Sequence, residues 1–199
     1  MPFANYTDLL AAIPSWLMRS DLTAQIPDFV VLCESRNNKR LRTRDMESTA
    51  NLTVGADNKF TLPTDYIEAR RVLSNTDPVT ALQPITLDQG TRFVTPSYDF
   101  YYAIKGSQLI NYPFNASPIT LDYYAKIPPL SLNATNWLLT NAPEVYLYGT
   151  LLQSAPFLED DARIVTWGNL YEAAITELSK MDQRAVFGKT IARVRGTTP

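Results

Sequence analysis

The segment IVTWGNLYEAAITEL (164–178) carries the clearest structural signal in the chain. Its apolar side chains recur at intervals of three and four residues, which is the spacing of one face of a helix. The members of this face are Ile164, Trp167, Tyr171, Ala174, Ile175 and Leu178. The acidic run Glu159–Asp161 comes just before them, where the helix dipole favours negative charge. The segment therefore predicts a long C-terminal helix with one buried face.

Helical spacing also occurs before this segment and at the start of the chain. A helix is expected after Asn141, with Pro143 at an early helical position and apolar residues up to Ala155. Another is expected from the capping pair Thr7–Asp8 to Leu17, with a kink or an early stop at Pro14. The remaining one should begin near Thr23–Ala24, accept Pro27 in its first turn and run to about Met46.

The period changes to two in the centre of the chain, which is typical of strands. Leu52 and Val54, then Phe60 and Leu62, alternate around the turn residues 55–58 and predict a β-hairpin. Five further strand-like runs follow, each bounded by Pro, Gly, Asn or Asp: 68–74, 80–84, 98–105, 108–112 and 119–125. Gly106–Ser107 marks a second hairpin. The fold class is thus α+β.

We expect one structural domain overall, a helical bundle with an inserted antiparallel β region and extended arms. The N-terminal helices of the bundle occupy 1–50, the β region 51–135 and the C-terminal helices 136–182. A basic C-terminal arm follows at 183–199. Fourteen prolines against seven glycines favour stiff, extended connections.

Composition excludes several kinds of chemistry. The chain has 199 residues, a formal net charge of −2 and no histidine, so Ser-His-Asp catalysis, Cys-His catalysis and histidine-ligated zinc are impossible. Cys33 is the single cysteine, which rules out an intramolecular disulfide. Neither GxGxxG nor GxxxxGK(S/T) is present. The chain is therefore expected not to be an enzyme and to hold no cofactor or metal.

The sequence also bears on where the chain acts. The first residues, 1–16, lack the basic start of a signal peptide and include Asp8, so export is not expected. No run of apolar residues reaches the length of a membrane span, and no membrane partner is expected. Synthesis in a cytoplasm, where a lone thiol stays reduced, fits these features.

The strongest charge feature is a basic cluster between residues 36 and 44. Arg36, Arg40 and Arg44 are four residues apart and would continue the apolar face of their helix as a cationic stripe. The full cluster is Arg36, Lys39, Arg40, Arg42 and Arg44. It is either a solvated helix end that complements the helix dipole, or a docking surface for an acidic partner or a phosphate backbone.

Three other groups of side chains could carry chemistry. Asp160 and Asp161 are adjacent, and neighbouring helical positions point about 100° apart, so helix capping is favoured over a shared metal. The basic tail, which contains Arg184, Lys189, Arg193 and Arg195, is either a mobile terminus or a segment that contacts an acidic surface of another copy. The aromatic residues of the β region are expected in the core or at a subunit interface rather than stacked on bases. These are Tyr98, Phe100, Tyr101, Tyr102, Tyr112, Tyr123 and Tyr124.

Several strings together resemble the head-to-tail adaptor proteins of tailed bacteriophages, of the short-tailed type. They are WLMRSDLTAQIPDFVVLCESRNNKRLRTRDME (16–47), LPTDYIEARRV (62–72), LDYYAKIPPLS (121–131) and NWLLTNAPEVYLYGTLLQSAPFLEDDARIVTW (136–167). The resemblance covers about residues 5–180. It implies a structural virion protein at the portal vertex, a connector or gatekeeper that forms a twelve-subunit ring beneath the portal.

The resemblance further implies that the ring extends the DNA channel, helps to close it after packaging until ejection, and offers a platform to the tail nozzle or tail tube protein. Its implied partners are further copies of itself, the portal protein, that tail protein and the packaged DNA. The C-terminal arm would reach the portal through Phe187, Lys189, Arg193 and Arg195. The basic cluster would meet a neighbouring subunit or line the channel.

Two other functions stay open from the residues. A small DNA-associated accessory protein would use the Arg36–Arg44 cluster on phosphates, with binding that falls steeply with salt. A hydrolase would need two convergent carboxylates, for example Glu68 or Asp99 facing a second acid in a cleft.

Overall fold

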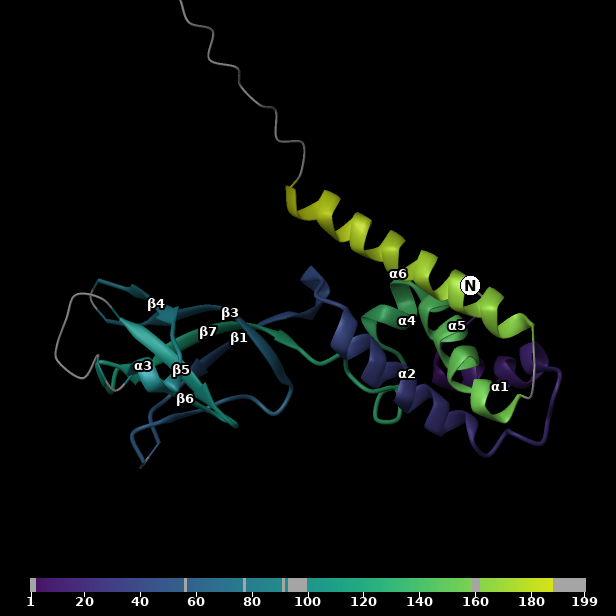
Figure 1. Ribbon diagram of the computed structural model, residues 1–199, viewed down its shortest axis with the longest axis horizontal. Helices are drawn as coiled ribbons and strands as arrows, with labels where there is room; N and C mark the ends of the chain where they lie inside the picture. The colour runs from purple at the N-terminus through teal and green to yellow at the C-terminus, as the bar shows by residue number, and fades with distance from the viewer. Residues whose placement is uncertain are drawn as a thin grey trace, which may run out of the picture. The chain divides into compact units, whose positions relative to one another are not determined.

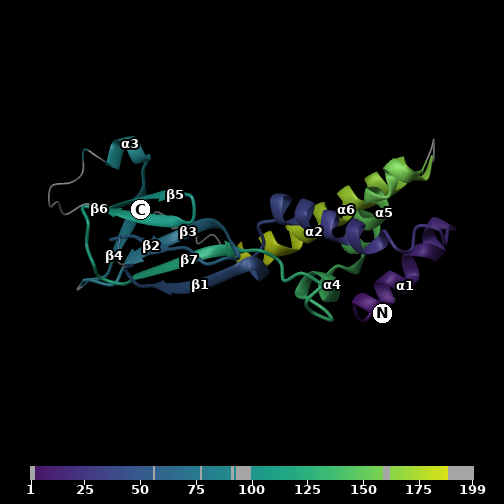
Figure 2. The ribbon, with the colours of Figure 1, turned by 90° about the horizontal axis from the view of Figure 1, so that it is seen from below.

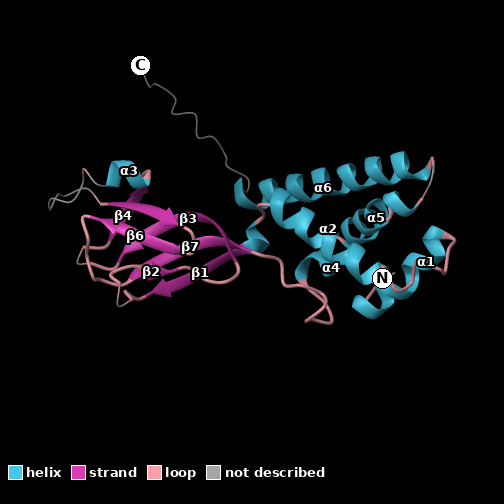
Figure 3. Cartoon of the chain, turned by 60° about the horizontal axis from the view of Figure 1, so that its bottom comes forward, coloured by secondary structure: helices cyan, strands magenta, loops and turns pink. Residues whose placement is uncertain are grey.

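The structure is a computed structural model that describes residues 3–55, 57–76, 78–90, 92, 100–158 and 162–187 (Figure 1). The chain divides into two compact units. The helical unit comprises Met1–Asp45 together with Ile127–Pro199, and the sheet unit comprises Met46–Lys126. Figure 3 colours the helices and strands of the two units. The prediction of an α+β chain is confirmed.

The first helix, α1, spans Tyr6–Leu17 and contains Pro14. Its N-cap is Asn5, whose side chain accepts a hydrogen bond from the backbone N of Asp8 at 2.9 Å. The capping oxygen predicted from Thr7–Asp8 was therefore wrong, because Asn5 already satisfies a free amide of the first turn, whereas Asp8 is the acidic residue of that turn. Pro14 does not stop the helix, which continues until Met18 adopts a left-handed φ of 55°.

The second helix, α2, spans Ile26–Arg40 and is shorter than the expected run to Met46. It ends because Leu41 is extended (φ −85°, ψ 138°), which turns its side chain into the core with 1% exposed. Arg44–Met46 then form a separate 3-10 turn. The predicted stripe through Arg44 was therefore wrong: only Arg36 and Arg40 lie on one helix face.

The C-terminal part of the helical unit contains three helices. They are α4 (Trp137–Asn141), α5 (Pro143–Gln153) and α6 (Arg163–Phe187), with a 3-10 turn at Ala155–Phe157. Pro143 is at the start of α5, as predicted, whereas α4 was not anticipated. In Figure 1, α5 lies between α2 and α6, and it contacts both. Of the predicted buried face of α6, Trp167, Tyr171, Ala174, Ile175 and Leu178 are buried.

The sheet unit, whose strands are labelled in Figure 2, contains a sheet. It has seven strands in the order β1-β7-β3-β4-β5-β6-β2. The strands are β1 (Glu47–Leu52), β2 (Phe60–Thr61), β3 (Tyr66–Ser74), β4 (Thr80–Pro84), β5 (Tyr101–Lys105), β6 (Gln108–Tyr112) and β7 (Ile119–Ala125). The short helix α3 (Leu87–Gly90) follows β4. The pairs are antiparallel, as expected, except that β4 and β5 are parallel.

The two expected hairpins differ in outcome. β5 and β6 pair across Gly106, whose φ of 59° suits a residue without a Cβ, and this hairpin is confirmed. The hairpin expected around residues 55–58 is reduced to one bridge between Val54 and Phe60. The two strands of this expected hairpin pair with other strands instead: β1 pairs with β7, and β2 pairs with β6.

The core of the sheet unit is formed by alternate side chains of these strands. Tyr102 and Tyr123 belong to it, together with Leu52, Phe60, Leu62, Val72, Leu82, Leu109, Ile119 and Leu121. Two of the aromatic residues are thus core residues, as expected. Tyr98 lies outside the described residues. Among the helices that the structure describes, none has the length and hydropathy needed to cross a membrane.

Candidate interaction surface

The basic cluster of α2 is organised by one aromatic residue of α6. Tyr171 is fully buried, and its hydroxyl donates a hydrogen bond to Oδ1 of Asn37 at 2.7 Å. The guanidinium carbons of Arg36 and Arg40 lie 4.8 Å and 5.5 Å from the centre of the Tyr171 ring. Stacking on a buried ring holds both cations against the helical unit while their polar edges stay accessible.

The residue after Tyr171 neutralises part of this charge. Glu172 accepts two hydrogen bonds from Arg40, at 2.5 Å and 2.6 Å, and lies 3.6 Å from Arg36. The hydrogen bond from Arg40 holds the pKa of the Glu172 carboxyl below its usual value, and the same pair raises the pKa of Arg40. Two arginines and one glutamate leave a net positive charge at this point of the surface.

The structure does not bring the other three members of the cluster to this point. Lys39 is exposed on α2. Arg42 donates hydrogen bonds to the carbonyl oxygens of Asn38 and Leu41, at 2.9 Å and 2.6 Å. Arg44 is exposed beyond the end of α2, and its backbone N donates to Oδ1 of Asp182 at 2.8 Å. The cluster is therefore one compact pair with three residues around it.

The remaining site residues expected from the sequence lie at the end of the chain. Phe187 is the last residue of α6. Lys189, Arg193 and Arg195 lie outside the described residues, as do Asp160 and Asp161. Within the part of the chain that the structure describes, no group of three His, Cys, Asp or Glu side chains is placed to hold a metal ion.

Tyr171 and Glu172 are the two residues that sequence reasoning did not assign to this surface. The sequence predicts Tyr171 only as part of a buried helix face, and Tyr171 is indeed buried. Glu172 is 132 positions from Arg40 along the chain, and no local pattern links such distant residues. The pairing depends on how α5 spaces α2 from α6.

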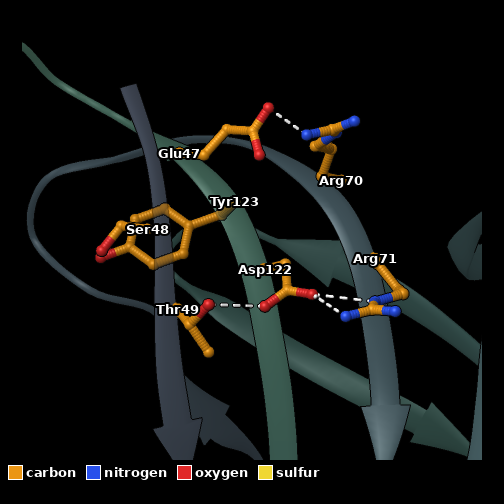
Figure 4. Close-up of a pocket in the computed structure, with 7 residues that line it drawn as sticks. All are labelled: Glu47, Ser48, Thr49, Arg70, Arg71, Asp122 and Tyr123. Carbon is orange, nitrogen blue, oxygen red and sulfur yellow. Dashed lines mark hydrogen bonds and ion pairs between the residues drawn. The ribbon is translucent and has the colours of Figure 1, made fainter. Parts of the chain in front are cut away.

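A second polar surface lies in the sheet unit, in a hollow of about 610 Å³ beside β1, β7 and β3 (Figure 4). Asp122 accepts hydrogen bonds from Oγ1 of Thr49 at 2.7 Å and from Nε of Arg71 at 2.8 Å, which lower the pKa of its carboxyl. Glu47 forms an ion pair with Arg70. Each arginine that lines the hollow thus faces an acid of the chain itself, so the hollow does not favour an anionic ligand.

Changing Glu172 to glutamine is expected to release Arg36 and Arg40 at little cost to folding. Half of the Glu172 side chain is exposed, so the loss in unfolding free energy should not exceed about 1 kcal/mol near pH 7. A lowered carboxyl pKa contributes stability above the unfolded pKa and loses it as the pH falls through the folded pKa. Urea unfolding measured from pH 7 to pH 3 should show that the variant lacks this contribution. Its unfolding free energy should therefore fall less towards acid pH than that of the wild-type chain.

Glu177 on the same helix is the matched control, because it is exposed and no described residue pairs with it. Glu177→Gln should change neither the stability nor its pH dependence. A loss of more than about 2 kcal/mol in Glu172→Gln would contradict the surface assignment of this cluster.

Comparison with known protein families identifies a match over most of the chain. Residues 4–195 match a family model described as SU10 adaptor protein. No curated protein matches the chain. The matched range includes all described elements of both units.

Proposed function

Because the chain belongs to the SU10 adaptor family, a family of phage head-to-tail adaptors, we propose that it forms a ring under the portal and extends the DNA channel. The ring contains twelve copies, helps to close the channel after packaging, and provides the platform on which the tail nozzle or tail tube assembles. The observation that carries this proposal is the extent of the family match, from residue 4 to residue 195.

Membership of the family by itself supports the broader part of this function. An adaptor is a structural protein rather than an enzyme, and the family implies a location in the virion and interactions with portal and tail components. Within this frame, we assign the N- and C-terminal helices to a bundle that carries the ring contacts. We assign the segment from Phe187 to Arg195 to contact with the portal.

The Arg36–Arg40 pair is proposed to meet a neighbouring subunit or the DNA in the channel. Stacking on Tyr171 and pairing with Glu172 fix the positions of both guanidinium groups, which favours a defined contact. Arg40→Glu separates the two cases. Weakened ring assembly would identify a contact between subunits, and normal assembly with altered DNA retention would identify a channel contact.

The function is tested by imaging the portal vertex of the phage that encodes this chain by cryo-electron microscopy. We expect density that fits this chain directly below the portal, with twelvefold symmetry. A variant that lacks residues 187–199 should bind the portal more weakly, and unchanged binding would contradict the role of this segment. Absence of the chain from the vertex of intact particles would contradict the adaptor function, and salt-dependent DNA binding would then favour the accessory protein.

A further inference from the structure

Helix α2 has an outer face that carries exposed apolar side chains. Val31 and Leu32 are 51% and 52% exposed, although both are large and apolar. Asp28 is one turn before them, Ser35 and Lys39 follow at the next two turns, and all three are exposed. The side chains of Asp28 and Lys39 make no hydrogen bond or ion pair with another residue that the structure describes. We call Asp28, Val31, Leu32, Ser35 and Lys39 the α2 face.

The apolar part of the α2 face continues beyond the helix. The ring of Phe29 packs against that of Phe157 with centroids 5.2 Å apart, and Phe157 is 48% exposed. Leu32 is one turn from Phe29 on α2, so the apolar part of the α2 face lies on the same stretch of helix as this pair of rings. Clustered exposed apolar residues with a polar rim are typical of protein interaction sites.

The C-terminal third of α6 has an exposed face of the same kind. Met181 is 58% exposed, Glu177 is one turn before it, and Lys180 and Arg184 lie beside it. None of these three charged side chains pairs with another residue in the described part of the chain. All four side chains line a shallow groove on α6. We call Glu177, Lys180, Met181 and Arg184 the α6 face.

The apolar centres of the two faces lie far apart on the helical unit. Near the first residue of α6, Arg163 donates hydrogen bonds to the carbonyl oxygens of Trp16 and Leu17, and Arg19 donates to that of Phe157. Phe157 packs on Phe29 of α2, one turn from Leu32, so the apolar part of the α2 face is at this end of the unit. Met181 is about 27 Å further along α6 than Arg163, at 1.5 Å per residue. The two centres therefore cannot meet within one copy of the chain.

Each face has an acid towards its N-terminal end, an apolar centre, and a base towards its C-terminal end. If the two helices pack antiparallel with Leu32 beside Met181, Asp28 comes close to Arg184. The reason is that Asp28 is about 6 Å from Leu32 along α2, and Arg184 is about 4.5 Å from Met181 along α6. This register covers apolar surface on both helices and joins two charges that have no partner in the described part of one chain.

We propose that the α2 face binds the α6 face of a second copy of the chain, with the two helices antiparallel. At the far end of this contact, Lys39 of one copy can reach Glu177 of the other, which adds a second pair of opposite charges. Two α2 faces packed antiparallel would also bring an acid of each copy near a base of the other. Such a contact is isologous, however, and stops at two copies. Contact between two different faces is heterologous and can close a ring. The inference thus rests on the ring proposed above and names its interface.

Disulfide trapping between purified full-length chains tests this contact. A copy with Leu32→Cys is mixed with a copy with Met181→Cys, and mixed dimers are identified by mass spectrometry after mild oxidation. They should form at least tenfold faster than with a Val165→Cys copy, which places a thiol near the other end of α6 at a position that is 70% exposed. Burial raises the pKa of the native Cys33 thiol to about 12 and keeps it unreactive in every mixture.

Charge reversal provides a second test of the same contact. Asp28→Lys in the Leu32→Cys copy should slow trapping about threefold, and Arg184→Glu in the Met181→Cys copy should restore it. Glu144→Lys is the matched control, because Glu144 is also an exposed acid in the first turn of a helix, and its reversal should leave the rate unchanged. The three substituted side chains are exposed, so the variants are expected to fold.

Three results would overturn the proposal. They are equal trapping at Met181→Cys and Val165→Cys, no rescue by Arg184→Glu, and dimers of the Leu32→Cys copy with itself that form faster than mixed dimers. The last result would identify a symmetric contact between two α2 faces. None of these measurements needs a phage particle, so the adaptor function would remain a separate question for the vertex imaging.

Discussion

Replacing Gly149 with valine is expected to lower the free energy of unfolding by about 3 kcal/mol, the upper end of the usual range for overpacking a core. A Cβ at Gly149 would lie 2.5 Å from Sγ of Cys33 and 3.0 Å from Cε2 of Tyr171. Cys33 is on α2 and Tyr171 is on α6, so glycine allows α5 to approach both helices at once. Valine would force the three helices apart and move the ring that supports Arg36 and Arg40.

The measurement is urea or thermal unfolding of the full chain, where each kcal/mol shifts Tm by about 2–4 °C. Gly168→Ala is the matched control, because a Cβ there meets only Cδ1 of Leu152, at 4.0 Å. Alanine at this half-buried position of α6 should leave stability unchanged or raise it by about 1 kcal/mol. Equal losses in the two variants would show that close packing at Gly149 is not the cause.

Strand positions were predicted well because they depend on local signals. The bounds of β4, β6 and β7 agree with the expected runs 80–84, 108–112 and 119–125. Each run alternates or is rich in β-branched and aromatic residues, and turn residues bound it on both sides. Helix ends were predicted less well, since the end of α2 at Arg40 is set by burial of Leu41 in the tertiary core.

The partners of strands that no hairpin joins were beyond local reasoning. Glu47 in β1 pairs with Tyr124 in β7, and Gln83 in β4 pairs in parallel with Tyr101 in β5. Such pairings reflect how the whole sheet closes over its core, and hydrophobic periodicity carries no information about them. The same limit applies to the site. Spacing placed Arg36 and Arg40 on one face, but the position of Glu172 beside them follows only from the packing of α5.

Replacing Glu34 with alanine is expected to cost about 3 kcal/mol, because it leaves two buried donors without an acceptor. Glu34 is 6% exposed on α2. Its Oε1 accepts hydrogen bonds from the backbone N of Leu130 at 2.8 Å and from the hydroxyl of Tyr146 at 3.2 Å. These bonds tie α2 to α5 and to the segment that follows Ile127. Urea unfolding of the full chain measures the loss.

Asn38→Ala is the comparison, because Asn38 is half-buried and holds the same segment through one hydrogen bond, which its Oδ1 accepts from the backbone N of Ile127 at 2.9 Å. That variant should lose about 1 kcal/mol. A similar loss in both variants would mean that the buried carboxylate of Glu34 is not what secures the segment.

The pH dependence of the Glu34→Gln variant isolates the charge of this carboxylate. Burial raises the pKa of Glu34 above its ordinary value, and the hydrogen bonds from Leu130 and Tyr146 only partly oppose that shift. When a carboxyl pKa is raised on folding, the unfolded chain ionises first as the pH rises. Stability is then highest below the unfolded pKa of about 4.3 and falls until the pH passes the folded pKa.

The wild-type chain should therefore lose stability relative to Glu34→Gln as the pH rises from about 4 to 7. Carboxyls whose pKa is lowered, such as those of Asp122 and Glu172, act in the opposite direction. They are present in both proteins, so their contributions cancel in the difference between the two unfolding curves. A difference that stays constant over this range would show that Glu34 does not change its pKa on folding. Its role would then be confined to accepting hydrogen bonds.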